Sequence, residues 1–327
     1  MEEKIQTTNS FSKSSIPVIF THTGNALYLQ LALLQAKKIC GNQIHLLGDN
    51  SNKADYINHH LISDFENSEL YNNFKNYFKN LSPNSYDYEL FCFKRWFLIL
   101  EFCKKNNIEE FYCVDSDVLI YKNLYELKDI LKNIDFSVIR ITGKFAGPQC
   151  SYFKISALEK YCNFILNYYQ SRFNELESLY NQFKNEKNIS GISDMVLLAL
   201  FCEENIGKYI DFDFEDKERN FCFDENISCS AGFKMKNGIK EVTFKDGIPY
   251  CKRLDDNSEI PFYMLHFQGC AKALMEKYCI LSCNEKSESP YYKKLKSKEL
   301  KIKTKDFIRK LIPKSIRKII KKLIKEN

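Results

Sequence analysis

The sequence lacks the run of about 18 or more apolar residues that a membrane-spanning helix requires. Its first residues, Met1 to Ser15, are polar and contain no apolar segment of the kind found in a signal peptide. We therefore expect no spanning helix, a flexible N-terminus over residues 1–15 and a location in the cytoplasm.

Paired cysteine motifs are also absent, although the chain has 13 cysteines. No Cys-x-x-Cys pair occurs, and the closest spacing, Cys279 to Cys283, lacks the paired knuckles or the nearby His of a zinc site. The simplest interpretation is a set of free, mostly buried thiols in a reducing compartment. The sequence shows no internal repeat either, which excludes repeat architectures.

Hydrophobic residues make up 44% of the 327 residues and aromatic residues 14%, which is enough for a sizeable core. The charge is unevenly distributed. Residues 291–327 hold fifteen Lys or Arg and three Asp or Glu, a net +12, so that residues 1–290 carry −6 of the total of +6. An acidic body disfavours nucleic-acid binding, whereas the basic tail favours an anionic partner of its own. We place the domain boundary at 290.

Apolar runs and helical periodicities alternate along the body, as in α/β folds. The runs predict strands at 16–20, 43–49, 111–114, 136–141, 151–155 and 260–265. The periodic segments predict helices at 26–38, 88–105, 123–134, 157–183 and 195–204. Residues 50–85 are assigned only helical pieces and loops, residues 143–149 a loop, and residues 242–250 a hairpin around an Asp-Gly turn. The predicted fold is a mixed, mostly parallel sheet flanked by helices.

Two carboxylates follow the apolar run Phe111 to Val114, which is typical of a strand buried on both faces. Asp115 and Asp117 are separated only by Ser116, and apolar residues resume at once. The crevice beyond the carboxyl ends of such strands is where open α/β sheets bind ligands. Two acids there can hold a divalent cation that also takes up phosphates. The alternative is a pair of solvated turn formers or helix caps.

A second polar cluster follows the last apolar run. His266 ends that run, Gly269 lets the backbone approach a ligand closely, and Lys272 offers an ammonium group to a diphosphate. A neutral imidazole together with two carboxylates suits Mn²⁺ or a similar ion. The alternative for His266 alone is a hydrogen-bonded core histidine.

Asp115-Ser116-Asp117, followed by His266-x-x-Gly269-x-x-Lys272, resembles the pattern of the retaining, glycogenin-like family-eight glycosyltransferases and their bacterial lipopolysaccharide galactosyltransferase relatives. This resemblance implies the GT-A fold, a Rossmann-like nucleotide-sugar domain, over residues 16–290. The family often continues Lys-Pro-Trp, whereas this chain has Lys272-Ala273-Leu274, which leaves a sister family open.

The resemblance also implies functions for individual residues. Asp115, Asp117 and His266 would bind Mn²⁺ or Mg²⁺. Gly269 and Lys272 would contact the diphosphate of a UDP-sugar, with Ser116 among the residues that bind this donor.

Further positions are similar in placement to functional residues of that family. Asp194, before the helix at 195–204, is the candidate catalytic residue, although a helix N-cap explains it equally well. Arg95 resembles a basic residue that reaches the donor; the alternative is a surface cation. Thr21, Thr23 and Asn25 follow the first strand, where the nucleotide lies in this fold, and a plain turn is the alternative. Candidates for the sugar pocket are Gln149, Ser151 and Gln268.

The tail contains a cationic amphipathic pattern over residues 307–325. Ile316, Ile319, Ile320, Leu323 and Ile324 share one face of a helix, and Lys and Arg fill the other face. Such a helix suits an anionic bilayer surface, so we expect a peripheral protein on the inner face of the cell membrane. A solvated tail is the alternative, and nucleic acid is disfavoured because the tail has few aromatics.

The predicted activity is transfer of a sugar from a nucleotide-diphosphate donor to a glycan or lipid-linked acceptor in surface polysaccharide or lipopolysaccharide biosynthesis. The resemblance implies retention of configuration. One alternative is a nucleotidyltransferase, which the single Gly and the lack of Lys or Arg in Thr21 to Asn25 disfavour. A non-catalytic glycan-binding or membrane scaffold is the other.

Overall fold

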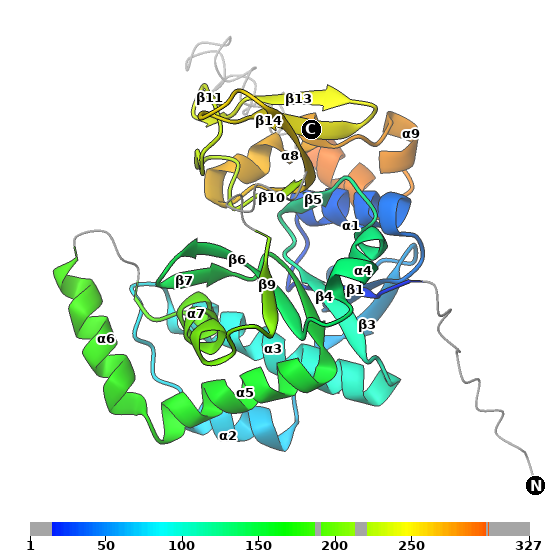
Figure 1. Cartoon of the computed structure of the whole chain (residues 1–327). Coiled ribbons are helices and arrows are strands. Elements are labelled where there is room, and N and C mark those ends of the chain that lie inside the picture. The colour runs from blue at the N-terminus through cyan, green and yellow to red at the C-terminus, as the bar shows by residue number, and fades with distance from the viewer. Residues whose placement is uncertain (1–14, 187–190, 213–220, 299, 301–327) are drawn as a thin grey trace, which may run out of the picture.

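The computed structural model describes residues 15–186, 191–212, 221–298 and 300. These residues form an α/β fold around one large sheet (Figure 1). In spatial order its strands are β3 (Asn58–Leu61), β2 (Ile44–Gly48), β1 (Val18–Thr21), β4 (Glu110–Val114), β8 (Cys150–Lys154), β6 (Phe136–Thr142) and β7 (Phe145–Gly147), with β9 (Tyr209–Asp211) also paired to β6.

The first four strands in this order are parallel to one another. β8 runs antiparallel to both β4 and β6, β7 runs antiparallel to β6, and β9 is parallel to β6. Only β7 and β8 therefore oppose the common direction of this sheet, and the predicted mixed, mostly parallel sheet is confirmed.

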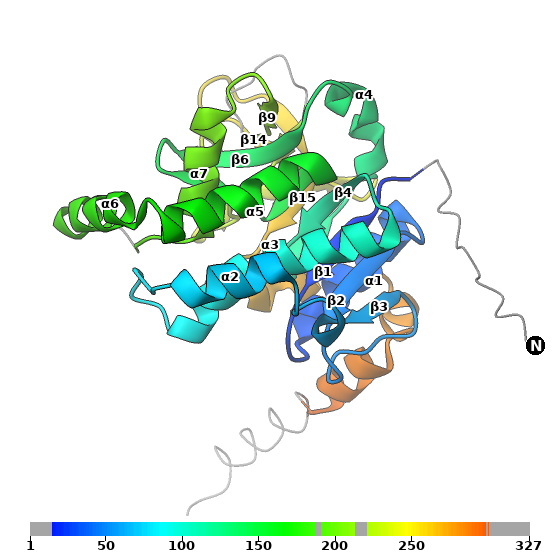
Figure 2. The ribbon, with the colours of Figure 1, turned by 90° about the horizontal axis from the view of Figure 1, so that it is seen from below.

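Side chains alternate between two hydrophobic cores, one on each face of the sheet. Along β1, Val18 and Phe20 belong to one core and Ile19 to the other. The core of Ile19 also takes in the helices that cross the sheet in Figure 2: α2 (Glu69–Tyr77), α3 (Tyr86–Asn106), α5 (Ile155–Gln170) and α7 (Asp194–Glu204). The opposite core contains α1 (Leu27–Cys40) and the second sheet. β4 is buried on both faces, as predicted, because Phe111 and Tyr112 are both fully buried.

Local signals explain where α3, the helix that carries Arg95, begins and ends. Ser85 accepts a hydrogen bond from the backbone N–H of Tyr88 and caps the first turn. The helix stops at Asn107, whose φ of 53° places it in the left-handed region that ends many helices. The sequence pattern placed this helix correctly to within two residues at its start.

A second sheet packs above α1 (Figure 1). It contains the apolar residues that directly follow Asp117. Its strands are β10 (Cys222–Phe223), β15 (Glu259–His266), β14 (Ile248–Lys252) and β13 (Val242–Lys245), with β5 (Val118–Ile120) paired to β15. The predicted hairpin is β13–β14, and both Asp246 and Gly247 have positive φ at its turn. A short ribbon of β11 (Met235–Lys236) and β12 (Ile239–Lys240) adjoins this sheet.

Several elements differ from the sequence-based expectations. β3 was missed because its sequence, Asn58 to Leu61, is polar, as an edge strand partnered on one side allows. β7 lies within the expected loop at 143–149. The expected helix at 123–134 is a 3-10 turn, η2 (Leu124–Leu127), followed by α4 (Lys128–Leu131). The long helical pattern at 157–183 is interrupted near Ser171, where α5 ends and α6 (Phe173–Asn185) begins.

After β15 the chain forms η3 (Gly269–Leu274), α8 (Met275–Tyr278) and α9 (Cys283–Lys286). Residues 290–298 are helical, and Tyr292 is buried against the body. The amphipathic pattern at 307–325 lies outside the described residues. Among the described helices, none is long and apolar enough to cross a membrane. All thirteen cysteines are free and most are buried, as expected.

Candidate metal and donor site

The two acids lie where the chain passes from the main sheet to the second sheet. Asp115 follows β4 and donates its backbone N–H to the carbonyl of Gln149 at 2.9 Å, which extends the pairing of β4 with β8. Asp117 precedes β5, and its carbonyl accepts the N–H of Phe267 at 2.9 Å. In the antiparallel β5–β15 ladder, Val118 lies opposite His266. The pairing of β5 with β15 therefore places His266 next to the two acids.

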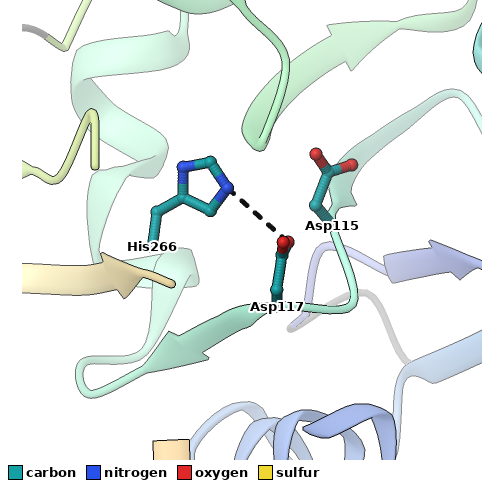
Figure 3. Close-up of side chains that lie close together, drawn as sticks. All are labelled: Asp115, Asp117 and His266. Carbon is teal, nitrogen blue, oxygen red and sulfur yellow. Dashed lines mark ion pairs between the residues drawn. The ribbon is translucent and has the colours of Figure 1, made fainter. Parts of the chain in front are cut away.

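The ligand atoms of Asp115, Asp117 and His266 all lie within 4.8 Å of one another (Figure 3). The Nε2 atom of His266 lies 3.6 Å from Oδ1 of Asp117. On the other side of the ring, Nδ1 lies 2.7 Å from the carbonyl oxygen of Glu225, which can only accept a proton. Nδ1 therefore donates, and Nε2 is the nitrogen left to bind a cation. Two carboxylates and one available imidazole nitrogen fit Mn²⁺ or Mg²⁺.

Lys272 adds a positive charge at the edge of this triad. Its Nζ atom lies 3.1 Å from Oδ2 of Asp117 and 5.2 Å from the centre of the Tyr28 ring. The Lys272 side chain is 35% exposed, so the ammonium remains accessible to a ligand. Gly269, one turn earlier, has a φ of 60°. An ammonium group beside an aromatic ring and an open approach suits an anionic group such as a phosphate.

Arg95 joins the triad to Asp194. Its guanidinium donates to Oδ1 of Asp115 at 2.6 Å and to Oδ2 of Asp194 at 2.5 Å. The same Asp194 oxygen accepts the indole N–H of Trp96 at 3.1 Å. Asp194 is the first residue of α7, and Ser193 holds the N-cap position. Asp194 is thus a buried, ion-paired carboxylate at the site, and Arg95 is not a surface cation.

A sharp backbone turn presents Asp194. Gly191 has a φ of 103°, and a Cβ atom built on it would lie 2.4 Å from the carbonyl oxygen of Leu81. Only glycine fits such a close approach in the left-handed region. Ile192 then donates its N–H to the same Leu81 carbonyl at 2.9 Å, which fixes the start of α7.

Burial and neighbouring charges act in opposite directions on the triad. Burial raises the pKa of Asp115, and the adjacent Arg95 compensates only in part. Burial also acts to raise the pKa of Asp117, but His266 and Lys272 outweigh it and lower that pKa below its usual value. For His266, burial is outweighed by Asp117, so its pKa is raised. A negative charge on Asp117 and a positive charge facing it define the polarity of the site.

These residues surround a cavity of about 550 Å³, a size that suits a small-molecule ligand. The predicted residues that line it are Arg95, Asp115, Asp117, Gln149, Asp194, His266, Gln268, Gly269 and Lys272. The sequence interpretation missed part of its wall: Tyr88, Cys92, Ile141, Phe145, Pro148, Ser193, Met195, Glu225 and Asn226. Ser193 and Met195 flank the predicted Asp194 in the sequence. The others belong to no motif, and only the fold brings them to the cavity.

Four of the predicted donor-binding residues, Thr21, Thr23, Asn25 and Ser116, do not line this cavity. The Ser116 hydroxyl is 3.0 Å from Nδ1 of His22, which sits in the loop after β1. In that loop, Thr23 is exposed, and the hydroxyl of Thr21 is buried with no partner among the described residues. Asn25 donates its side-chain amide to the carbonyl of Ser51 at 2.8 Å. The loop after β1 is therefore connected to the segment that holds the two acids through the pair of Ser116 and His22.

Ser151, which was predicted for the sugar pocket, does not line the cavity either. It is fully buried within β8, and its hydroxyl has no hydrogen-bond partner among the described residues. Its strand position opposite Cys113 explains this, because the side chain points into the core between β4 and its helices.

No family model matches the sequence, and no curated protein does. Among solved structures, the chain is similar to mouse xyloside xylosyltransferase 1, with 10% identity, a TM-score of 0.42 and coverage of 61% of this chain and 85% of the other. It is also similar to a glycosyltransferase involved in the glycosylation of the major capsid of PBCV-1, with 11% identity, a TM-score of 0.42 and coverage of 81% and 98%. The chain is similar as well to the galactosyltransferase LgtC, with 14% identity, a TM-score of 0.41 and coverage of 84% of this chain and 96% of the other. Similarity this low assigns no activity, so the function must be argued from the site itself.

Proposed function

We propose that the protein is a metal-dependent glycosyltransferase that moves a sugar from a nucleotide-diphosphate donor, UDP-linked, to a hydroxyl of a glycan or lipid-linked acceptor. The observation that carries this proposal is the convergence of Asp115, Asp117 and His266, with Lys272 beside them, on one cavity. A diphosphate needs positive charge on more than one side, and this site offers a cation position and an ammonium group together.

Asp115, Asp117 and His266 would hold Mn²⁺ or Mg²⁺, which supplies charge neutralisation for the leaving diphosphate when it is bound. Lys272 donates hydrogen bonds to the same diphosphate, because its side chain is partly exposed and its ammonium already lies beside the site. Stabilising charge where it develops is the largest single contribution that such a site can make. Gly269 adds no side chain, so the diphosphate can lie against the backbone there.

Arg95 and Asp194 position the donor sugar or the acceptor in this proposal. Arg95 is held by two carboxylates, so its orientation is fixed before any ligand arrives. Asp194 has one oxygen shared by Arg95 and Trp96, and it lines the cavity. We propose transfer with retention of configuration, in which the departing phosphate oxygen takes up the acceptor proton. Thr21, Thr23, Asn25 and Ser116 would contact the nucleotide.

The acceptor would lie against the wall formed by Tyr88, Phe145 and Met195. Aromatic and apolar groups of this kind pack against the faces of sugar rings. Residues 307–325 would hold the enzyme on an anionic membrane surface at the inner face of the cell membrane, near a lipid-linked acceptor. A surface polysaccharide or lipopolysaccharide is the product class that we propose.

A nucleotidyltransferase is disfavoured by the loop after β1. The N–H of Gly24 is already bound to Oδ2 of Asp49 at 2.6 Å, so the loop offers no free glycine amide to a triphosphate at that position. Because Asp49 lies beside it, the loop is also electrostatically unsuited to a highly charged anion.

The proposal is tested by incubating the protein with a panel of UDP-sugars and Mn²⁺ and measuring released UDP. We expect hydrolysis of at least one donor, loss of this activity in EDTA and loss in Asp117→Asn. Asp129→Asn, which changes an exposed aspartate on α4, is the matched control and should retain full activity. Binding of UDP without turnover of any donor would instead indicate a non-catalytic module.

A further inference from the structure

A fully buried ion pair lies behind His266. Nζ of Lys240, on β12, is 2.7 Å from Oδ1 of Asp224, and the two side chains are 1% and 0% exposed. Taking two such charges out of water is unfavourable, and an apolar pair of similar volume is often at least as stable. A stabilising role therefore does not explain the pair, and its contacts must be considered.

The pair binds the backbone at the end of β15. The second carboxylate oxygen of Asp224 accepts the backbone N–H of His266 at 3.1 Å. Lys240 also donates to the carbonyl of Asn226 at 2.7 Å. One ion pair thus holds both the strand end that carries His266 and the segment 224–226 that lies beside it.

That segment contacts the imidazole directly. The carbonyl of Glu225 accepts the Nδ1 proton of His266 at 2.7 Å, and the N–H of Ile227 donates to the carbonyl of His266 at 2.9 Å. Gln149, which lines the cavity, donates to the carbonyl of Glu225 at 3.2 Å. The direction of Nε2 toward Asp117 depends on where the Glu225 carbonyl lies, and Asp224 and Lys240 determine its place.

We propose that Asp224 and Lys240 are positioning residues for His266: together they fix the Glu225 carbonyl and the backbone of His266, so that the Nδ1–H form is selected and Nε2 faces the cation position. This inference rests on the proposed function, because it assigns His266 to the metal. Neither residue touches the cavity through its charged group. Outer-shell partners of metal-binding histidines act in this way, and their loss typically costs about 10- to 100-fold in metal affinity.

Two variants test whether the ion pair of Asp224 and Lys240 positions His266. Asp224→Asn keeps the size of the side chain and removes the charge. Asp224→Asn with Lys240→Met removes both charges, so that no unpaired charge remains in the core. Tyr152→Phe is the matched control, because it deletes a hydrogen bond from a buried tyrosine to Glu110 at the opposite end of β4. Thermal unfolding shows which variants are folded.

The first measurement needs no metal. In NMR spectra of the metal-free protein, the Nδ1 proton of His266 should give a protected imidazole signal, assigned by its absence in His266→Gln. We expect this signal to be lost or exchange-broadened in both pair variants and kept in Tyr152→Phe. An unchanged signal in a folded pair variant would overturn the inference.

The second measurement is calorimetric titration with Mn²⁺. We expect an affinity lower by about 10- to 100-fold in each pair variant. In a His266→Ala background, Asp224→Asn should have an effect within about twofold, because the residue acts through His266. An equal loss in both backgrounds, or wild-type affinity in a folded pair variant, would overturn the inference. If the wild type binds no Mn²⁺, the proposed function fails, and the NMR signal still decides whether the pair positions His266.

Discussion

His266 lies opposite Val118 in the ladder between β15 and β5, so its imidazole reaches the carboxylate of Asp117, the residue before Val118. A strand pairing between distant parts of the chain thus assembles the candidate metal ligands. Because β5 continues directly from the turn that holds Asp115, the same pairing orients both acids. The second sheet is therefore a structural part of the site.

Arg95 separates two carboxylates that would otherwise repel each other. We expect Arg95→Gln to lower the free energy of unfolding by about 3 kcal/mol, because it leaves Asp115 and Asp194 without their common partner in a mostly buried place. Urea denaturation measures this change. Adding Asp194→Asn to Arg95→Gln should restore part of the loss, since one of the uncompensated charges is then gone.

The control for Arg95 is an exposed ion pair. Lys144 and Glu186 are 45% and 48% exposed, and Lys144→Gln should change the free energy of unfolding by less than about 0.5 kcal/mol. If Arg95→Gln proved as mild as Lys144→Gln, the bridging arrangement would have no energetic importance.

Gln30 connects the loop after β1 to the start of the C-terminal segment. Its buried side-chain oxygen accepts the hydroxyls of Tyr56 at 2.7 Å and Ser289 at 2.6 Å, and its amide donates to Asn25 at 3.0 Å. We expect Gln30→Leu to cost about 1–3 kcal/mol, because buried partners lose their hydrogen bonds. Hydrogen exchange should become faster in both 21–27 and 290–298.

Gln170→Leu, at an exposed position at the end of α5, should leave exchange in these two segments unchanged. A Gln30→Leu variant in which only one of the two segments loses protection would contradict the connection.

The buried His45 predicts a dependence of stability on pH. Burial lowers its pKa from 6.5 to about 3 in the folded protein. Below pH 6.5 the unfolded chain binds a proton that the folded chain does not, so the free energy of unfolding falls as the pH falls toward 3. The expected slope from this group is about 1.4 kcal/mol per pH unit.

His45→Gln removes this contribution. The difference in slope between wild type and variant, measured by urea denaturation from pH 7.5 down to pH 4.5, isolates His45 from the other buried groups. Parallel curves across this range would show that His45 is protonated equally in both states.

Much of the fold was predictable from the sequence, because buried strands are short runs of apolar residues and helices have apolar residues at a regular helical spacing. Phe111 to Val114 and Ile260 to Leu265 are examples that the structure confirms as parts of β4 and β15. β3 was not predictable from its pattern, since Asn58, His59 and His60 are polar and its partner strand lies elsewhere in the chain. The assignment of Val118 to a second sheet likewise depends on a distant strand.

The site likewise contains residues that the sequence predicted and residues that it did not. Asp115, Asp117, His266 and Lys272 belong to spaced motifs, and the structure brings them together. The ion pair of Asp224 and Lys240 belongs to no motif. The two side chains bind the backbone N–H of His266 and the carbonyl of Asn226, and only the folded chain brings these groups together. Tyr88 and Phe145 were missed for a similar reason: each comes from a different element of the cavity wall.

The most direct test of the central claim is calorimetric titration of UDP into the protein with and without Mn²⁺, for the wild type and for Asp117→Ala. The account predicts binding to the wild type that requires Mn²⁺ and is lost in Asp117→Ala, with the thermal stability of the variant as the check on folding. Binding that is independent of Mn²⁺, or that is unchanged in Asp117→Ala, would contradict it.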